Sequence, residues 1–316
     1  MKANYLRLSV TDRCNLKCLY CRPSKSVRQL KQDELLNFEE ISGIVGLAAE
    51  WGIRKVRITG GEPLVRNNII DLVKMLSRIK GIRDLPLTTN GVRLEEFARP
   101  LKKAGLSRVN VSLDSLERGK FARVTGRDSL LQVLRGIRAA REANLEPIKI
   151  NVVILKGINE DEILDFVNFA RGKSLILRFI EYMPTNGSEQ NSWYFSNARV
   201  KEIIERRWGT LKPLPFSFNY LPARYFKIDH TKVVLGFISP ISQPFCHLCT
   251  RLRLTAAGKL RPCLGLDLEI DLKKSLRGKN RDYEIKASFD LAMNEKLKER
   301  PEPLYPRNKY MFQIGG

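Results

Sequence analysis

The chain has 316 residues, long enough for one large α/β domain or for a domain with an appended unit, and its composition, 43% hydrophobic and 28% charged, predicts a soluble globular protein. Asp12 and Arg13 interrupt the apolar residues near the start, and no apolar run reaches the ~18 residues of a membrane span, so we expect neither a secretion signal nor a membrane protein. The net charge of +22 favours anionic partners, but it is spread along the chain and no motif predicts specific nucleic-acid binding.

Up to about residue 208, short apolar runs alternate with segments whose apolar residues recur every three and four positions. We expect strands over 5–10, 55–59, 85–89, 108–113, 148–155 and 175–183. We expect helices over 38–51, 69–79, 94–104, 130–143, 161–170 and 200–208, the first capped by Asn37 with Glu40 three residues on. Such βαβ units predict a parallel sheet, and six of them predict an incomplete (β/α)6 TIM-like barrel.

Several predicted strands carry polar side chains at alternate positions, which places those side chains on one face of the sheet. They include Arg7 and Ser9, Arg57 and Thr59, Asn110 and Ser112, Lys149 and Asn151, and Arg178. In a closed barrel these inward positions would form apolar layers. We therefore expect a cavity for an anionic ligand, with reacting groups at the carboxyl ends of the strands.

The pattern changes after about residue 212, where prolines break the helical period and only short strands are expected, over 225–228, 233–238, 251–255 and 259–260. We interpret residues 1–212 as the barrel domain and residues 213–316 as a smaller C-terminal α+β unit. The chain ends in Gly315 and Gly316.

The six cysteines form two groups of three and leave none over. The first group has the spacing C-x3-C-x2-C after the first strand, and the second has the spacing C-x2-C-x13-C; they are Cys14, Cys18 and Cys21, then Cys246, Cys249 and Cys263. Two such triplets favour reduced, metal-binding thiolates in a cytoplasmic protein over disulfides. Four-iron clusters normally take four cysteines, so that three leave one iron open to a substrate. Zinc is the alternative at both groups, with His247 as a fourth ligand at the second.

The turn after the second predicted strand reads Gly60-Gly61-Glu62-Pro63. Its glycines permit close approach of the backbone to a ligand, and Glu62 can accept a hydrogen bond from an ammonium group. Alone, this segment is only a turn.

Together, the C-x3-C-x2-C loop and this turn resemble the signature of the radical S-adenosylmethionine (SAM) superfamily. The resemblance implies a [4Fe-4S] cluster on Cys14, Cys18 and Cys21 and one-electron cleavage of SAM to a 5′-deoxyadenosyl radical. It also implies SAM contacts, and the residues in those positions are Tyr20, Gly61, Ser112 and Met183.

A closer likeness spans nearly the whole chain. It rests on Leu-Arg-Leu-Ser-Val-Thr-Asp-Arg-Cys-Asn at 6–15, Arg-Ile-Thr-Gly-Gly-Glu-Pro-Leu at 57–64, Thr-Thr-Asn-Gly at 88–91, Asn-Val-Ser-Leu-Asp-Ser at 110–115, Lys-Ile-Asn at 149–151, Arg-Phe-Ile-Glu-Tyr-Met at 178–183, and the second triplet with the Gly-Gly end. These segments resemble the GTP 3′,8-cyclase family, also called molybdenum cofactor biosynthesis protein A.

This likeness implies a second [4Fe-4S] cluster on Cys246, Cys249 and Cys263, which faces GTP, and a role in activity for Gly315 and Gly316. It implies GTP contacts at Arg7, Arg57, Thr88, Lys149, Arg251, Leu252 and Arg253, to which the place of Arg178 on the sixth strand adds a further candidate. Guanidinium groups suit bidentate contact with phosphate oxygens, which agrees with this assignment.

The implied reaction abstracts hydrogen from carbon 3′ of GTP and closes the radical onto carbon 8 of guanine, giving (8S)-3′,8-cyclo-7,8-dihydroguanosine 5′-triphosphate in the first step of molybdenum cofactor biosynthesis. Implied partners are a reduced ferredoxin or flavodoxin as electron donor, cyclic pyranopterin monophosphate synthase downstream and a second copy of the chain in a homodimer. Two alternatives stay open: a peptide-modifying radical SAM maturase with an auxiliary cluster, and a zinc-binding nucleic-acid protein.

Overall fold

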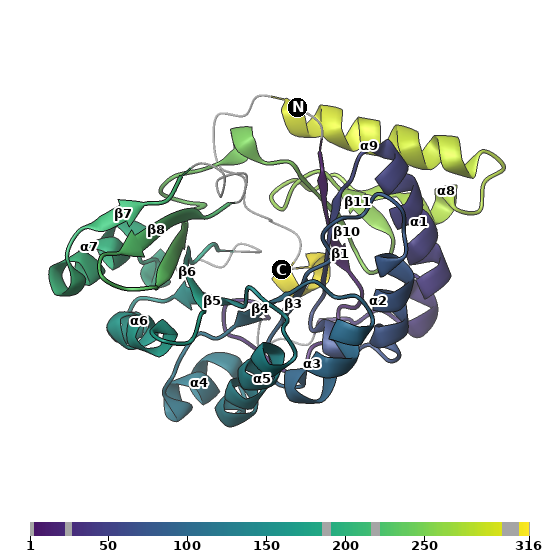
Figure 1. Ribbon diagram of the computed structural model, residues 1–316. Helices are drawn as coiled ribbons and strands as arrows, with labels where there is room; N and C mark the ends of the chain where they lie inside the picture. Colours follow the sequence, from purple (N-terminus) through teal and green to yellow (C-terminus); the bar gives the residue numbers. More distant parts are fainter. Residues whose placement is uncertain (1–2, 23–26, 185–190, 216–221, 299–309, 316) are drawn as a thin grey trace.

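The computed structural model describes residues 3–22, 27–184, 191–215, 222–298 and 310–315, and a single mixed sheet runs through it (Figure 1). The strands are β1 (Tyr5–Ser9), β2 (Lys55–Thr59), β3 (Leu87–Thr89), β4 (Val109–Ser112), β5 (Lys149–Ile154), β6 (Ile176–Glu181), β7 (Leu211–Pro213), β8 (Arg224–Ile228), β9 (Val234–Ile238), β10 (Arg251–Leu254), β11 (Lys259–Arg261) and β12 (Ile270–Asp271). The helices are α1 (Phe38–Trp51), α2 (Ile69–Ser77), α3 (Leu94–Lys103), α4 (Arg118–Thr125), α5 (Leu130–Glu142), α6 (Ile163–Ala170), α7 (Asn197–Trp208), α8 (Leu272–Ser275), α9 (Arg281–Leu297) and α10 (Met311–Ile314).

Strands β1 to β6 lie side by side in chain order, and each pairs in parallel with the next. Figure 1 shows them as an arc with α1 to α6 along its outer side. The strand order is linear, β12-β11-β10-β1-β2-β3-β4-β5-β6-β9-β8-β7, so that the arc does not close on itself. The expected incomplete (β/α)6 barrel is confirmed.

The segment after residue 212 extends both edges of this arc. Strand β10 pairs in parallel with β1, and β9 pairs in parallel with β6. Strands β11 and β12 continue one edge in antiparallel pairing, and β8 and β7 continue the other. Helix α9 lies against α1, where the rings of Trp51 and Phe289 stack with centroids 5.4 Å apart (Figure 1). The division at residue 212 stays a prediction, and the structure adds that both parts share one sheet.

The two faces of the strands differ as the alternation predicts. On β1, Leu6 and Leu8 are 0% exposed and belong to the hydrophobic core, in register with apolar residues of β2 and β10. Each such side chain contributes about 1.5–3 kcal/mol on burial. The expected cap of α1 is also confirmed, because Glu40 N donates to Asn37 Oδ1 at 2.7 Å and Asn37 N donates to Glu40 Oε2 at 2.9 Å.

Helices α4, α8, α9 and α10 and strands β7 and β12 were not predicted from the sequence. Helix α4 has eight residues and includes Gly119, too short a pattern for its period to stand out. Helix α9 is different, because its buried residues Ile285, Phe289, Ala292 and Met293 have helical spacing that the sequence shows. Among the described residues, no helix combines the length and apolar content needed to cross a bilayer.

Candidate active site

The inward face of the sheet is lined by cations that the register brings side by side. Arg7 of β1 lies opposite Arg57 of β2 and Arg253 of β10, while Tyr5 lies opposite Lys55 and Arg251 in the neighbouring row. Across the arc, Thr88 lies opposite Asn110, which in turn lies opposite Lys149, and Asn151 lies opposite Arg178. Arg57, Lys149, Arg178 and Arg253 are between 4% and 7% exposed. The expected polar interior is confirmed.

Burial and mutual repulsion shift the pKa values of these cations. Burial lowers the pKa of Lys149 to about 6, assisted by the charges of Arg178, Arg108, Arg57 and Lys55. Burial, followed by the charges of Arg7 and Arg251, lowers the pKa of Arg253 as well. The interior therefore concentrates positive charge, and an anion placed there would be strongly attracted.

Two tyrosines accept hydrogen bonds from these arginines. Arg57 Nε donates to Tyr5 Oη at 2.5 Å, and Arg57 Nη1 donates to Thr88 Oγ1 at 3.3 Å. On the other side of the arc, Arg178 Nη2 donates to Tyr225 Oη. Neither tyrosine was among the residues predicted from the sequence.

Several buried polar atoms of the interior have no protein partner among the described residues. They are Asn110 Oδ1, Asn151 Oδ1 and Arg178 Nε. A buried polar group without a partner is costly, and a bound ligand would satisfy it. The two amide oxygens need a hydrogen-bond donor and the guanidinium nitrogen needs an acceptor, so the interior fits a polar ligand that offers both.

The first cysteine loop continues from β1 and is held by the turn after β2. Val10 N donates to Thr59 O at 2.9 Å, Gly61 N to Thr11 O at 2.7 Å, and Glu62 N to Arg13 O at 2.8 Å. A Cβ atom on Gly60 would lie 2.6 Å from Thr11 O, and one on Gly61 would lie 2.7 Å from the carbonyl carbon of Arg13. The close backbone approach that the glycines permit is therefore to the cysteine loop, where the sequence had suggested a ligand.

Glu62 is 1% exposed and accepts hydrogen bonds from the protein itself. Thr89 Oγ1 donates to Oε1 at 2.7 Å, Leu64 N donates to Oε1 at 3.1 Å, and Asn90 N donates to Oε2 at 2.6 Å. Burial raises the pKa of Glu62 to about 7, although these hydrogen bonds oppose the shift. Asn90 Nδ2 in turn donates to Cys14 Sγ at 3.8 Å, so that Glu62 positions a residue next to the first cysteine.

Helix α4 holds the other side of this loop. Lys17 N donates to Thr125 O at 2.8 Å and Leu19 N donates to Val124 O at 2.9 Å, both carbonyls in the last turn of the helix. Tyr20 Oη donates to Asp114 Oδ2 at 2.6 Å, and Asp114 Oδ1 accepts from Val153 N at 2.9 Å. Tyr20 is thus fixed between the cysteine loop and β5.

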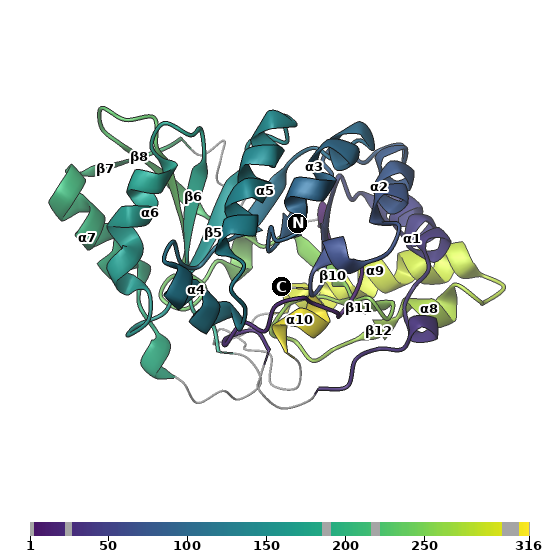
Figure 2. The ribbon, with the colours of Figure 1, turned by 90° about the horizontal axis from the view of Figure 1, so that it is seen from below.

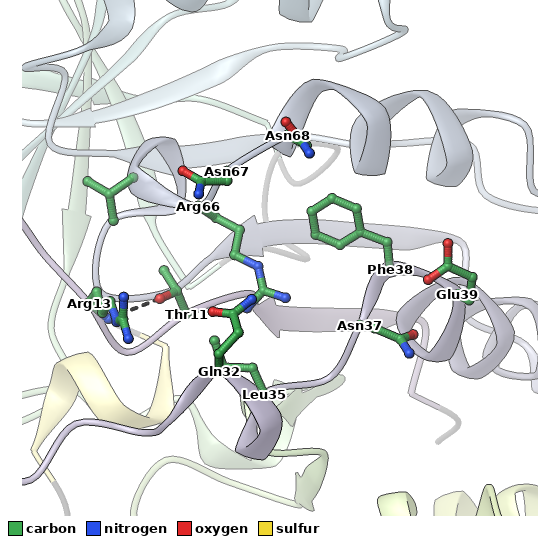
Figure 3. A pocket seen from close by; sticks show the side chains of 11 residues that line it. Thr11, Arg13, Gln32, Leu35, Asn37, Phe38, Glu39, Arg66, Asn67 and Asn68 are labelled. Atoms are coloured by element: carbon green, nitrogen blue, oxygen red, sulfur yellow. Dashed lines mark hydrogen bonds between the residues drawn. The ribbon is translucent and has the colours of Figure 1, made fainter.

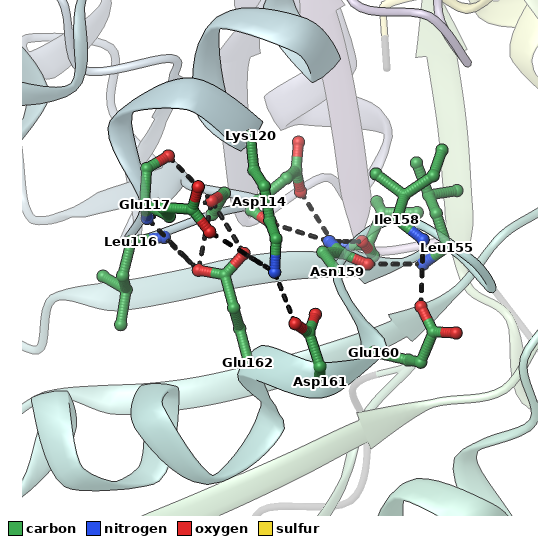
Figure 4. Close-up of polar contacts among 12 residues, drawn as sticks. Asp114, Leu116, Glu117, Lys120, Leu155, Ile158, Asn159, Glu160, Asp161 and Glu162 are labelled. Carbon is green, nitrogen blue, oxygen red and sulfur yellow. Dashed lines mark hydrogen bonds and ion pairs between the residues drawn. The ribbon is translucent and has the colours of Figure 1, made fainter.

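A buried carboxylate ties α4 to the loop before α6 (Figure 4). Glu162 is 5% exposed and accepts hydrogen bonds from Ser115 Oγ at 2.8 Å and from Leu116 N at 2.7 Å. Lys120 lies 3.8 Å from Glu162 and 2.5 Å from Asp161. This network fixes the segment between β4 and α4 that carries Asp114.

The second cysteine group lies at the opposite end of the strands. Cys246 and Cys249 precede β10, which runs parallel to β1, whereas Cys14 follows β1. Cys263 follows β11, which runs antiparallel to β10 and ends at the same side. A strand of five residues spans about 17 Å, so the cationic interior lies between the two cysteine groups. The first cysteine group thus lies at the carboxyl ends of the strands, where we expected reacting groups, and the second lies at the opposite end.

The thiols of each group lie close enough to interact electrostatically. Burial raises the pKa of Cys14 to about 11 and that of Cys21 to about 12. Burial also raises the pKa of Cys18, and the charges of Cys21 and Cys14 raise it further. Burial also opposes ionisation of Cys249, but the charges of Arg251 and Lys296 lower its pKa to about 6. Arg251 Nε donates to Cys249 Sγ at 3.3 Å.

The described residues contain no group of three His, Cys, Asp or Glu side chains that could hold a single metal ion, and His247 is exposed. A zinc ion needs all its ligands within about 2.3 Å, whereas a cluster binds each thiolate at a different iron. All six cysteines are free, and donors lie next to Cys14 Sγ and Cys249 Sγ. Free thiols with neighbouring donors fit the thiolate ligands of an iron–sulfur cluster.

Helix α10 and Gly315, the last described residues, lie next to β10 at this interior (Figure 2). Gly315 O accepts a hydrogen bond from Arg253 Nη1 at 2.6 Å. Gly315 has φ 75°, and a Cβ there would lie 3.0 Å from Ser9 Cβ and 3.2 Å from Thr59 Cγ2. The backbone of Phe312 forms a hydrogen bond with the Cys21 thiol. The Arg22 guanidinium lies 5.4 Å from the centroid of the Phe312 ring. Gly316 lies outside the described residues.

The remaining predicted residues are placed as follows. Ser112 lies opposite Asn151 on the inward face, and Met183 follows β6 in a half-buried position. Leu252, by contrast, is 0% exposed within the hydrophobic core, so that only its backbone is available to a ligand.

A cavity of about 440 Å³ lies outside this interior, next to the cysteine loop (Figure 3). Thr11 and Arg13 line one wall and Arg66 with Phe38 another, the guanidinium 5.4 Å from the ring centroid. Arg66 Nη2 is held by Leu36 O at 2.9 Å. None of the predicted SAM or GTP residues lines this cavity.

Residues 8–170 match the Radical SAM superfamily, and residues 175–301 match the family Molybdenum Cofactor Synthesis C. With its open barrel and cysteine loop, the chain belongs to the radical SAM superfamily. The GTP 3′,8-cyclase of Thermodesulfovibrio yellowstonii is 45% identical over 321 residues, which cover 99% of this chain and 97% of that protein. The GTP 3′,8-cyclase of Moorella thermoacetica is 44% identical over 315 residues, with coverage of 99% and 97%. Within the superfamily, the chain belongs to the GTP 3′,8-cyclase family.

Solved structures agree with this fold. The structure of Streptococcus suis SuiB bound to S-adenosylmethionine is similar with a TM-score of 0.63 and 15% identity, covering 98% of this chain and 77% of that one. Native anSMEcpe with bound AdoMet is similar with a TM-score of 0.59 and 16% identity, covering 98% and 87%. At such identities the likeness shows the fold alone.

Proposed function

We propose that this chain is a radical SAM GTP 3′,8-cyclase, a lyase that converts GTP into (8S)-3′,8-cyclo-7,8-dihydroguanosine 5′-triphosphate in the first step of molybdenum cofactor biosynthesis. A 5′-deoxyadenosyl radical abstracts hydrogen from carbon 3′ of the ribose, and the substrate radical closes onto carbon 8 of guanine. The family of the chain supports this activity. The observation that carries it in the structure is a buried cationic interior between two cysteine triplets at opposite ends of the strands.

Each triplet would hold one [4Fe-4S] cluster by three thiolates: Cys14, Cys18 and Cys21 the first, Cys246, Cys249 and Cys263 the second. When bound, the first would supply the electron that cleaves SAM, and the second an open iron for the guanine end of GTP. The chain's own task is orientation and the exclusion of water. Tyr20, fixed by Asp114, and Gly61, packed on the cysteine loop, would line the SAM site together with Ser112 and Met183.

The cations of the interior would bind GTP. Arg57, Lys149 and Arg178 are buried, and no ion pair joins them to a carboxylate of the described residues. The two guanidinium charges, and that of Lys149 once it takes up a proton, are therefore available to phosphate oxygens. Arg7, Thr88, Arg251 and Arg253 would complete the site, with Leu252 contributing its backbone. Gly315, which accepts a hydrogen bond from Arg253, would lie next to the nucleotide, and a role in activity for Gly316 is part of the same proposal.

The partners follow from this chemistry. Each cleavage of SAM consumes one electron, which a reduced ferredoxin or flavodoxin would deliver, and the product would pass to cyclic pyranopterin monophosphate synthase. Six free cysteines suit the reducing cytoplasm, where we place the protein. A homodimer is a further proposal.

The decisive experiment is anaerobic turnover of the reconstituted protein with SAM, reductant and GTP deuterated at carbon 3′. Deuterium in the 5′-deoxyadenosine product supports the proposal. Unlabelled 5′-deoxyadenosine, formed at one rate with or without GTP, would keep the radical SAM chemistry and reject GTP as the substrate.

Variants of the two triplets separate their roles. We expect Cys14→Ala to abolish SAM cleavage, because the first cluster loses a ligand. We expect Cys263→Ala to retain SAM cleavage without cyclisation. A Cys263→Ala variant that cyclised GTP at the native rate would contradict the role of the second triplet.

A further inference from the structure

Two side-chain units of the same composition flank the interior. In the first, Tyr5 of β1 accepts from Arg57 Nε at 2.5 Å, and Lys55 Nζ lies 4.9 Å from the centroid of the tyrosine ring. In the second, Tyr225 of β8 accepts from Arg178 Nη2, and Lys149 Nζ lies 5.7 Å from the ring centroid. Each unit thus joins one arginine and one lysine to a buried tyrosine, 7% exposed for Tyr5 and 2% for Tyr225.

The two units are close enough to interact electrostatically. Burial lowers the pKa of Arg178, and of the first unit Arg57 lowers it further while Tyr5 opposes the shift. The first unit therefore lies within electrostatic reach of the second. The charges of both arginines also lower the pKa of Lys149. One anion between the units would therefore interact with both.

The chemistry of the acceptor matters here. Among the described residues, neither Arg57 nor Arg178 forms an ion pair with a carboxylate, although buried arginines commonly pair with one. A carboxylate would orient the guanidinium but also cancel its charge. A phenol accepts the same hydrogen bond, and its protonated form leaves the positive charge for a ligand. Burial favours that form at Tyr5, but the neighbouring cations, Arg57 first, lower its pKa to about 7.

The second unit is built around a glycine. Gly236 of β9 lies in register with Arg178 on one side and Tyr225 on the other. A Cβ on Gly236 would lie 2.9 Å from Tyr225 Cε1 and 3.1 Å from Arg178 Cγ, closer than ordinary packing allows. The missing side chain creates the room in which the arginine and the phenol meet. Gly236 has no positive φ that would otherwise require glycine.

We propose that Tyr5 and Tyr225 are positioning residues, which fix Arg57 and Arg178 for the phosphates of the nucleotide. This inference rests on the proposed function, because it assigns the interior to GTP. The tyrosines act through the arginines, so that they govern phosphate recognition and leave the recognition of the base unchanged.

The test compares Tyr5→Phe and Tyr225→Phe with the parent protein, each carrying its reconstituted clusters. Dissociation constants are measured anaerobically for GTP, for guanosine and for inorganic tripolyphosphate. Loss of a hydrogen bond that orients a charged group predicts roughly a tenfold weaker binding of GTP and tripolyphosphate, with guanosine unchanged. Tyr283→Phe is the matched control, because Tyr283 is 76% exposed on α9.

Gly236→Ala is a second variant, which keeps both tyrosine hydroxyls but pushes Arg178 and Tyr225 apart. We expect it to lose GTP and tripolyphosphate affinity in the same selective way. In turnover, all three variants should raise KM for GTP more than they lower kcat. A merely structural role would not separate phosphate from nucleoside in this manner.

The outcomes distinguish this inference from the proposed function. Parent protein that binds GTP no more tightly than guanosine would reject the assignment of the interior to GTP. Parent protein that binds GTP tightly, with Phe variants that bind GTP and tripolyphosphate equally well, would overturn only the role of the tyrosines. An equal loss for guanosine and GTP would also overturn it, because the damage would then not concern phosphate.

Discussion

Nucleotide binding should be coupled to proton uptake by Lys149. Burial, together with the charges of Arg178, Arg108, Arg57 and Lys55, lowers the pKa of this lysine to about 6. At pH 7 only about one lysine in ten then carries its proton in the free protein. A triphosphate in the interior adds negative charge that opposes these repulsions, so that the bound state favours the ammonium form.

The magnitude follows from the difference between the two states. If the pKa returns towards 10.5 when GTP binds, Lys149 takes up about 0.9 proton at pH 7. The direction of the pH dependence is fixed, because a group that gains a proton on binding makes the affinity for GTP fall as the pH rises. Between about pH 6 and the pKa of the bound state, the association constant of GTP should fall by up to about tenfold per pH unit.

Titration calorimetry at pH 7 in buffers of different ionisation enthalpy measures this number directly. The γ-phosphate of GTP also titrates near this pH. We therefore compare the proton uptake of the parent protein with that of Lys149→Met, and the difference should be about 0.9 proton. Lys279→Met, at an exposed position, is the control and should leave the uptake unchanged. Equal proton uptake by the parent protein and Lys149→Met, or net release from Lys149, would refute the reasoning.

Two further predictions concern the supports of the cysteine loop. Gly61→Ala should lower the free energy of unfolding by roughly 1–3 kcal/mol, because its Cβ would lie 2.7 Å from a backbone carbon. The melting temperature and the iron content after reconstitution should fall with it. Gly46→Ala is the control and should change neither, because nothing lies within 4 Å of its Cβ. Glu162→Ala should lower the free energy of unfolding in urea by roughly 2–3 kcal/mol, because it leaves buried donors unpaired, whereas Glu95→Ala breaks an exposed pair with Arg135 and should cost less than about 1 kcal/mol. Equal effects of variant and control would contradict either argument.

The fold was largely predictable because its signals are local. Alternating strands and amphipathic helices predicted six βαβ units, and the polar alternation on β1, β2 and β5 predicted an inward face lined by cations. The pairing of β10 with β1 and of β9 with β6 was not predictable in this way. It joins segments that are far apart in the chain, and pairing partners leave no periodic pattern.

The site shows the same division between local and distant signals. The cysteine triplets could be found from spacing alone, because each lies in one short segment or hairpin. Tyr225 was missed because nothing near it in sequence indicates that its hydroxyl meets Arg178. The sequence predicted that Gly60 and Gly61 permit a close backbone approach. It did not predict that the approaching segment is the backbone of residues 11–13. Contacts between distant segments required the structure.

A cation-lined interior also has a consequence for stability. Folding buries Arg57, Arg178 and Arg253 together with Lys149. Loss of the Lys149 proton relieves only part of the repulsion among these groups, which stays unfavourable until an anion binds. A ligand that binds only the folded protein stabilises it by about 2.7 kcal/mol at a concentration of 100 times its dissociation constant. Inorganic tripolyphosphate should therefore raise the melting temperature of the parent protein, and less so that of Arg178→Met. A chloride salt of equal ionic strength is the control, because general screening would act on both proteins alike. If the two proteins responded equally to tripolyphosphate, the anion would not be bound at this interior.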